Sequence, residues 1–200
     1  YLSVTRMTQS DPLTQFANWF AEAGKTDIDK PNAMTLTTVG HSNRPHARIV
    51  LLSSFNEHGF VFHTNYNSVK GHDIAHNPQV SLSFWWDQLG YQIHINGTAE
   101  KTTDEESDSY FANRPRGSQI GAWASDQSQV IDSRESLQAK VRQFTGKFEG
   151  KDVPRPSHWG GYRVKPDQFE FWVNGADRLH DRFRFTLDNN GNWQSSRLAP

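Results

Sequence analysis

The sequence contains no cysteine among its 200 residues. Disulfide bonds, thiolate nucleophiles and cysteine-ligated zinc are therefore excluded. No apolar stretch approaches the roughly 20 residues that a membrane-spanning helix needs, and residues 1–10 lack the apolar core of a signal peptide. Because the absence of cysteine fits a reducing compartment, we expect a cytoplasmic protein without a membrane partner.

Excess charge of one sign is also lacking. Lysine and arginine number 21 against 22 aspartate and glutamate, for a net charge of −1, so no nucleic-acid partner is predicted. The motifs GxxxxGK[ST], GxGxxG and GxSxG are absent. His72 and His76 have the spacing of two metal ligands on one helix face. No third ligand accompanies them, so we interpret both as exposed helix residues and predict no metal site.

Aromatic residues, in contrast, are abundant, with 13 Phe, 7 Trp and 5 Tyr. Most are expected in the core, but such a supply also suits a flat conjugated ligand.

Local patterns predict an α+β fold with a mainly antiparallel sheet or barrel. Asp11-Pro12 marks a helix start and Gly24 its end, and the spacing of Asp132 and Glu135 is typical of a capping box. Further helices are expected at 67–77, after Thr103 and from residue 114. Strands are expected at 33–39, 46–55, 59–64, 79–86, 90–101, 160–164, 169–173, 178–187 and 193–198. Because no βαβ alternation occurs, we expect one domain over residues 1–200, with residues 1–10 flexible.

The stretch RPRGSQ (residues 114–119) combines several anion-binding groups. Arg114 and Arg116 carry guanidinium donors, Ser118 carries a hydroxyl, and a helical pattern that begins here offers backbone N–H groups. The local chemistry therefore predicts a generic anion site at this helix start.

A second candidate anion site lies where a strand leads into a helix. Thr64 and Ser68 supply hydroxyls, Lys70 falls in the first helical turn, and Arg48 lies on a neighbouring apolar strand. Helix dipole and charge together can hold a phosphate. An ordinary capped helix with a solvated lysine explains the same residues, and the local evidence favours that interpretation.

Two further polar groups accompany these sites. Gln127 and Ser128 follow the helix that starts at RPRGSQ; their side chains can read the edge of a heterocycle or simply form a turn. Arg178, His180 and Arg182 fall on one face of the expected strand 178–187. Such a face indicates either exposure to water or an anionic ligand.

Several segments in this order resemble the FMN-dependent pyridoxine/pyridoxamine 5'-phosphate oxidases over nearly the full length of the chain. The segments that carry the resemblance are ARIVLL (47–52), TNYNSVKG (64–71), YFANRPRGSQIGAWASDQSQVI (110–131), PRPSHWGGYRV (154–164), EFW (170–172) and RLHDRF (178–183).

The resemblance implies an FMN-binding split β-barrel with flanking helices. It implies a homodimer with FMN at the subunit interface, so that both chains build each site. The implied flavin contacts are Arg48, Ile49, Val50, Leu51, His63, Thr64, Lys70, Gln92, Gln127, Ser128, Trp172 and Arg182. The implied substrate-phosphate contacts are Tyr110, Arg114 and Ser118, whereas Arg116 is not among them. Arg178 and His180 are implied as catalytic residues over the substrate ring.

The implied reaction passes a hydride from the C4' carbon of a phosphorylated pyridine to flavin N5, after which O2 reoxidises the flavin and H2O2 is released. Three features depart from the family pattern: Ser53 stands where a lysine is usual, Val69 stands where an arginine is usual, and the family's N-terminal substrate-covering segment has no clear counterpart before Asp11. His63, where a tyrosine is usual, is a milder change. The oxidases of phenazine biosynthesis share the fold and also tend to lack the lysine. Two alternatives therefore remain, an oxidase of another reduced aromatic compound and a non-catalytic protein that binds FMN or pyridoxal phosphate.

Overall fold

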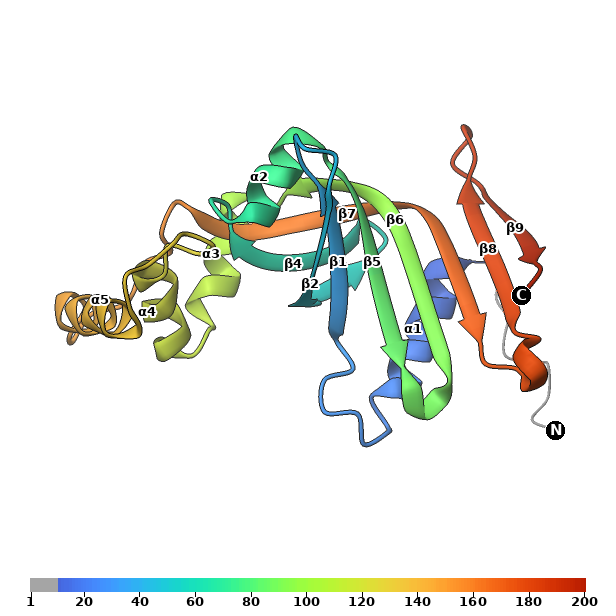
Figure 1. The fold of residues 1–200 in the computed structure, drawn as a ribbon, viewed down its shortest axis with the longest axis horizontal. Helices are drawn as coiled ribbons and strands as arrows, with labels where there is room; N and C mark the ends of the chain where they lie inside the picture. The colour runs from blue at the N-terminus through green and yellow to red at the C-terminus, as the bar shows by residue number, and fades with distance from the viewer. Residues whose placement is uncertain (1–10) are drawn as a thin grey trace.

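The computed structural model describes residues 11–200; residues 1–10, expected to be flexible, lie outside the described residues. The chain forms one antiparallel sheet in the order β2-β1-β5-β6-β7-β4-β3, and β8 and β9 continue it beyond β7 (Figure 1). The strands are β1 (Ala33–Val39), β2 (Pro45–Leu51), β3 (Ser54–Asn56), β4 (Gly59–Asn65), β5 (Gln79–Trp86), β6 (Tyr91–Lys101), β7 (Trp159–Val173), β8 (Asp181–Leu187) and β9 (Trp193–Leu198).

The sheet curls because β7 is shared by two neighbours along its length. Its first half pairs with β4 and its second half with β8, while β6 runs along nearly all of it. The helices are α1 (Pro12–Ala23), α2 (Val69–His76), α3 (Asp104–Ala112), α4 (Arg116–Ala124) and α5 (Arg134–Lys147), with short 3-10 turns at Asp87–Leu89 and Ala176–Arg178. The expected α+β, mainly antiparallel fold is confirmed.

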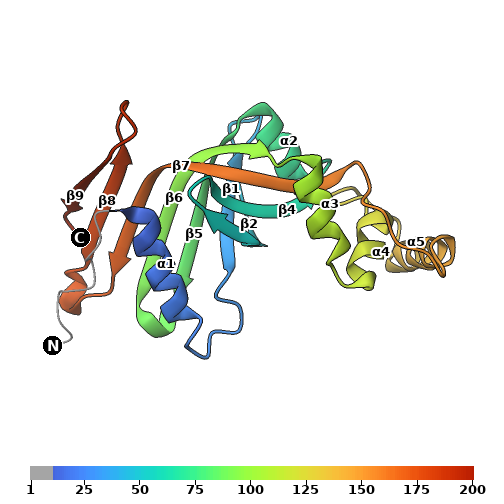
Figure 2. The same ribbon diagram turned by 180° about the vertical axis from the view of Figure 1, so that it is seen from behind.

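Helix α1 covers one face of the curled sheet (Figure 2). Asp11 caps it by accepting a 2.8 Å hydrogen bond from the Thr14 amide. Phe16 and Trp19 are fully buried, and the Trp19 ring stacks on Tyr91 at 4.0 Å. Most of the aromatic residues thus build the core, as expected.

The opposite face of the sheet lacks such a cover in the described chain. Its exposed apolar side chains include Ile49, Leu51 and Trp85, which are 64, 48 and 55% exposed. Apolar residues that are this exposed on one sheet face are typical of an interaction surface.

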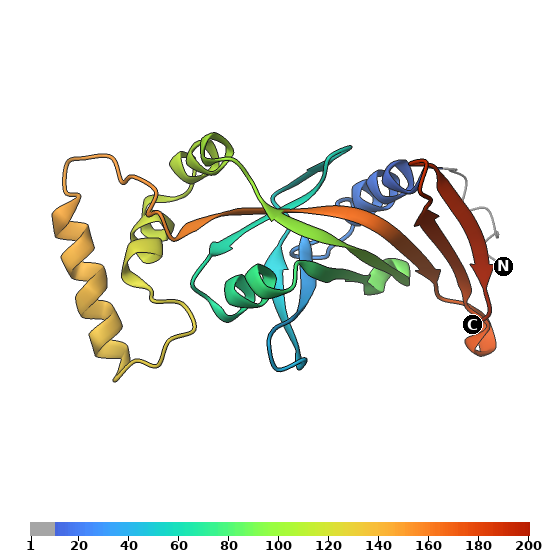
Figure 3. The ribbon, with the colours of Figure 1, turned by 90° about the horizontal axis from the view of Figure 1, so that it is seen from above.

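Helices α3, α4 and α5 form a second, smaller cluster at one end of the molecule, and the β8–β9 hairpin lies at the other end (Figure 3). Phe111, Ile120, Phe148 and Trp159 are buried in this cluster. Arg155 ties α3 to the start of β7, because its guanidinium binds both Asp104 and Asp108. The cluster holds the RPRGSQ stretch beside the sheet.

Four details differ from the expected elements. The strand expected at 46–55 is divided into β2 and β3. Strands 160–164 and 169–173 are one continuous strand, because β6 offers partners along its whole length. Ser133, and not Asp132, caps α5, since its side chain accepts from the Ser136 amide at 3.1 Å. The strand expected at 178–187 begins only at Asp181.

Candidate functional site

Lys70 is a buried cation that contacts only neutral oxygens. Its Nζ donates to Gln127 Oε1 at 2.7 Å and to the hydroxyls of Thr64 and Ser68, each at 3.2 Å. The side chain is 9% exposed, and no carboxylate in residues 11–200 forms an ion pair with it. Burial, and then the nearby charge of Arg48, lower the pKa of Lys70 to about 8. An unpaired buried charge is costly, so this geometry favours an anionic ligand.

The interpretation of Lys70 as a solvated lysine is therefore wrong. Ser68 does cap α2, by accepting from the Gly71 amide at 3.3 Å, but it also faces the amine. Gly71 allows this tight turn, because a Cβ there would lie 2.0 Å from the Tyr66 carbonyl oxygen. This turn places the Lys70 amine within hydrogen-bond distance of the Thr64 and Ser68 hydroxyls.

Arg48 lies on β2 beside the same site. Its Nη1 donates to the Thr38 hydroxyl at 2.7 Å, and its Nη2 lies 3.9 Å from Asp73 Oδ2. Asp73 is buried and also contacts His46 at 2.9 Å. Although burial opposes it, hydrogen bonds from Thr38 and His46 and the two positive charges lower the pKa of Asp73. The aspartate holds Arg48 in place without reaching Lys70.

Gln127 and Ser128 reach this site from the loop after α4. Besides the bond to Lys70, Gln127 Oε1 accepts from the Thr64 hydroxyl at 3.1 Å, and Ser128 Oγ accepts from the Val69 amide at 3.4 Å. Ser128 adopts a φ of +71°. A serine in this left-handed region is strained, and such strain is often found at functional sites.

The second anion-binding group is built by Arg114 on a stack of rings. Its guanidinium lies 4.4 Å from the centre of the Trp159 ring, and its Nη1 donates to the Ser118 carbonyl at 3.2 Å. Tyr110 stacks on His63 at 3.7 Å. Tyr110 and Ser118, expected to act together with Arg114, lie on α3 and α4, and Arg114 lies in the short link between these helices. Arg116 points elsewhere and donates to the Phe148 and Lys151 carbonyls at the end of α5.

His63 is paired with Ser53, and both residues are half-buried. Ser53 Oγ and His63 Nδ1 are 2.8 Å apart. Burial, and then the Arg114 charge, lower the pKa of His63 to about 4. The histidine is therefore neutral near pH 7, and Arg114 is the cation that this group offers.

One cavity extends from the group around Arg114 to Gln127, the hydrogen-bond partner of Lys70. It measures about 260 Å³ and is lined by Asn65, Arg114, Ser118, Gly121, Ala122, Ser125, Gln127 and Trp159. Gln127 contacts Lys70 on one side, and Arg114 and Ser118 lie on the other.

A third group of expected residues lies on the face of the sheet away from α1. Gln92 on β6, Trp172 on β7 and Arg182 on β8 occupy one cross-strand row. Arg182 Nε donates to Glu170 at 2.8 Å, and Trp85 extends the row on β5. From β2 to β8 the sheet advances five strand spacings, or ~24 Å along the sheet. The structure therefore does not bring this row together with Arg48 in one chain.

The run Arg48 to Leu51 is split between the two faces of β2. Arg48 and Val50 are half-buried on the side of the core, whereas Ile49 and Leu51 are exposed on the other. Alternation along a strand accounts for this.

Arg178 and His180 do not lie on a strand. They belong to a tight turn that precedes β8, in which Asp177 and Arg178 adopt φ values of +55° and +61°. The expected alternation of Arg178, His180 and Arg182 on one strand face is therefore wrong. His180 lies over Trp172, with ring centres 4.4 Å apart, and its Nδ1 accepts from the Gly175 amide at 3.2 Å.

Sequence reasoning did not single out Asp73, His94, Trp159 or Glu170. His94 bridges Gln92 and Ser83, and Glu170 binds Arg182. Alternation could have placed His94 and Glu170 on the polar face, but their partners come from other strands. In residues 11–200 no cluster of three His, Cys, Asp or Glu side chains could hold a metal. In the same range no helix has the length and apolar character to cross a membrane.

Comparison with known proteins identifies the family. Residues 20–148 match the family model described as "Pyridoxamine 5'-phosphate oxidase". Residues 159–200 match the "Pyridoxine 5'-phosphate oxidase C-terminal dimerisation region". A "Pyridoxine/pyridoxamine 5'-phosphate oxidase" from Trichormus variabilis is 49% identical over 96% of this chain and 89% of its own length. One from Burkholderia vietnamiensis is 52% identical over 95% and 89%.

A solved structure extends the likeness. PhzG from Burkholderia lata, in complex with tetrahydrophenazine-1-carboxylic acid, is 31% identical, with a TM-score of 0.92 over 100% of this chain and 98% of that one. A pyridoxamine 5'-phosphate oxidase-related, FMN-binding protein from Nostoc punctiforme, 13% identical with a TM-score of 0.75 over 96% of this chain and 100% of that one, shares the fold. The chain therefore belongs to the pyridoxamine 5'-phosphate oxidase family of flavin oxidases.

Proposed function

We propose that this protein is an FMN-dependent oxidase that converts pyridoxamine or pyridoxine 5'-phosphate to pyridoxal 5'-phosphate, with O2 as acceptor and H2O2 as product. One observation carries the proposal: a cavity of about 260 Å³ is lined by Arg114 and Ser118 and also by Gln127, whose side chain accepts a hydrogen bond from Lys70, so two cationic groups lie close to one cavity. The cofactor and the substrate of this reaction each bring one phosphate. The arrangement therefore matches the two ligands that must meet.

The residues around Lys70 fit the phosphate of FMN. Lys70 and Arg48 supply positive charge, and Thr64, Gln127 and Ser128 supply hydrogen bonds. When bound, FMN supplies the redox chemistry, by accepting a hydride from the substrate and passing the electrons to O2. The protein supplies binding, orientation and a fixed electrostatic environment.

We also propose that each chain folds as one FMN-binding domain. Each FMN site is then built by residues from two copies of the chain. The row of Gln92, Trp172 and Arg182 lies on the face that exposes Ile49 and Leu51. A second copy packed on this face would cover those apolar side chains and bring its own row to the flavin beside Arg48. The match to a dimerisation region supports this homodimer.

The substrate phosphate is assigned to Arg114, Ser118 and Tyr110. An arginine fork suits a phosphate because it donates two hydrogen bonds in a fixed geometry. Arg178 and His180 are the proposed catalytic residues, which orient the substrate ring. Because the Gly175 amide donates to His180 Nδ1, the proton of the neutral imidazole is on Nε2. His180 therefore presents an N–H donor to the ligand.

The turn that fixes His180 can be tested by Gly175→Ala. A Cβ at residue 175 would lie 2.1 Å from the Leu179 carbonyl oxygen, so the turn must shift. We expect kcat to fall roughly tenfold, as for the loss of one oriented hydrogen bond, while FMN affinity changes little. Gly117→Ala is the matched control, because nothing lies within 4 Å of a Cβ there. Unchanged kcat in Gly175→Ala would contradict the assigned role of the turn.

The proposed activity is tested with purified protein loaded with FMN. Pyridoxamine 5'-phosphate should bleach the flavin absorbance without O2 and release H2O2 in air. If neither B6 phosphate reduces the flavin, the proposal is wrong. Reduction only by an unphosphorylated aromatic substrate would favour the phenazine-type alternative. A yellow protein that no candidate substrate reduces would favour a binding protein.

Ser53 is the observation that favours the phenazine-type alternative. The group around Arg114 holds one cation, since His63 is neutral near pH 7. If the substrate is a B6 phosphate, Ser53→Lys should lower its KM by about tenfold, as expected for one added charge-assisted hydrogen bond. Steady-state kinetics at constant pH measures this, with Ser54→Lys on the neighbouring exposed residue as control. A KM that stays the same or rises would argue that the site takes a ligand with less charge.

A further inference from the structure

His94 on β6 links Gln92 on the same strand to Ser83 on β5 through two hydrogen bonds. Its Nε2 lies 2.7 Å from Gln92 Nε2, and its Nδ1 contacts Ser83 Oγ. Gln92 and His94 both point away from α1. Gln92 lies in the cross-strand row with Trp85, Trp172 and Arg182, and the half-buried His94 lies in the adjacent row with Ser83, Glu170 and Arg184.

The chemistry of these atoms couples the proton on His94 to the orientation of the Gln92 amide. An amide NH2 group only donates, so the nitrogen that faces it must be an unprotonated acceptor. His94 Nε2 therefore carries no proton, and Nδ1–H donates to Ser83. With its nitrogen on His94, Gln92 leaves its carbonyl oxygen Oε1 as the end of the amide that can accept from a ligand. The reverse orientation would require a proton on Nε2.

We propose that His94 is a positioning residue that selects which end of the Gln92 amide meets the flavin. This inference rests on the proposed function, because it takes Gln92 as a flavin contact. His94 itself need not touch the flavin. By accepting from Gln92 it presents the oxygen as the group that faces the ligand, and it holds the side chain in one rotamer.

The surroundings of His94 keep it neutral near pH 7. Burial lowers its pKa most; Glu170 on β7 raises it and Arg182 on β8 lowers it. Arg184 on β8 binds Glu170 at 3.9 Å, and Ser83 on β5 is uncharged. Protonation below the ordinary histidine range places N–H groups on both nitrogens. The Gln92 amide must then turn over, so the flavin meets a different hydrogen-bonding group at low pH.

The first test uses the full-length protein without FMN. Nitrogen-15 NMR of the histidine side chains distinguishes the two neutral tautomers, and the His94→Gln spectrum identifies the His94 signal by its absence. We expect His94 to carry its proton on Nδ1 at about pH 7.5. A proton on Nε2 would overturn the proposal, whatever the protein does with FMN. If His94→Gln does not fold, the wild-type signal is assigned instead by its correlation with the Ser83 neighbourhood.

The second test measures the dissociation constant of FMN by fluorescence quenching at about pH 7.5 and at a lower pH, chosen as one at which the NMR signal of His94 shows a proton on both ring nitrogens. His94→Leu removes the acceptor and should weaken FMN binding roughly three- to tenfold at the higher pH. His94→Gln supplies an acceptor that does not titrate. It should bind FMN like the wild type at the higher pH and, unlike the wild type, should not lose a further three- to tenfold at the lower pH.

The FMN phosphate also titrates in this range, so the readout is the ratio of wild type to variant at each pH. His58→Gln, an exposed histidine in the β3–β4 turn, is the matched control and should follow the wild type. The same pH step in His94→Gln and wild type would overturn the proposal. If the wild type binds FMN but oxidises no B6 phosphate, the proposed substrate fails while the role of His94 stands.

Discussion

Replacing Arg114 by methionine should raise the KM for pyridoxamine 5'-phosphate by roughly ten- to a hundredfold, the effect of losing a charge-assisted hydrogen bond of about 1.5–3 kcal/mol. The effect is large because Arg114 is the cation of its group, with His63 held neutral beside it. Methionine keeps the packing on the Trp159 ring, which Arg114 now covers at 4.4 Å, so the change isolates the charge. Steady-state kinetics with the FMN-loaded protein measures it.

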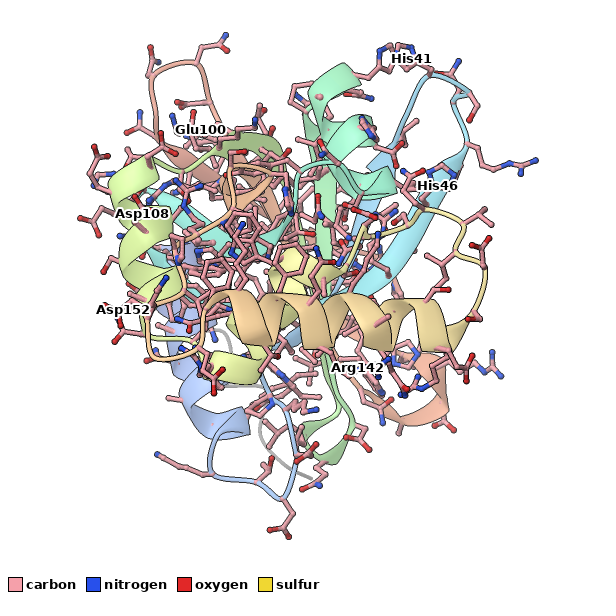
Figure 4. All side chains as sticks on the ribbon, turned by 90° about the vertical axis from the view of Figure 1, so that its left-hand side faces the viewer. His41, His46, Glu100, Asp108, Arg142 and Asp152 are labelled. Atoms are coloured by element: carbon pink, nitrogen blue, oxygen red, sulfur yellow. The ribbon has the colours of Figure 1, made fainter. Side chains whose placement is uncertain are left out.

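The Arg114 result needs two controls. FMN affinity should remain within about twofold, because the flavin phosphate is assigned to Lys70 and Arg48. Arg142→Met is the matched control, since Arg142 is exposed on α5, which crosses the front of the molecule in Figure 4. An unchanged KM in Arg114→Met, or an equal loss of FMN binding, would place the substrate phosphate elsewhere.

Replacing Lys70 by methionine should change FMN affinity and apoprotein stability in opposite directions. FMN should bind at least ten- to a hundredfold more weakly, through the loss of a buried charge-assisted contact. The apoprotein should become more stable, because Lys70 is 9% exposed and bonds only to neutral oxygens. Titration with FMN and denaturant unfolding without it measure the two effects.

The stabilisation should depend on pH in a defined window. The pKa of Lys70 is lowered to about 8, so between that value and its ordinary 10.5 the unfolded chain binds more protons. The free energy of unfolding of the wild-type apoprotein therefore rises with pH across this window. The advantage of Lys70→Met should be full below about pH 8, on the order of 3 kcal/mol, and should vanish near pH 10.5.

Two results would contradict this account of Lys70. An apoprotein that is destabilised by Lys70→Met would show that the cation is already neutralised by the protein. An advantage that is equal at all pH values would assign the gain to packing. Lys147→Met is a suitable control, because Lys147 lies on the end of α5, where it covers aromatic rings.

Elements with strong local signals could be predicted from the sequence. Asp11-Pro12 started α1 and Gly24 ended it, because caps and proline act within one turn. The strands expected at 79–86 and 90–101 are confirmed, with boundaries that agree to within one residue. Asp132 failed as a cap because Ser133 competes for the same amides, and local sequence does not rank two adjacent cap residues.

The turn before β8 could not be predicted from local sequence patterns. Alternation placed Arg178 and His180 on a strand, but Asp177 and Arg178 take left-handed backbone angles that no strand pattern reveals. A close approach of the chain at Gly175 holds this turn, and it sets the proton position of His180.

The fold class, the family and the candidate anion-binding residues could be predicted from the sequence alone, because these depend on residue types in order along the chain. The tertiary structure decided which of those residues are buried, neutral or unpaired. Lys70 meets Gln127 across 57 positions, and His94 meets partners on two strands. Burial and hydrogen-bond partners set the charge state of a side chain, and they exist only once distant segments have packed together.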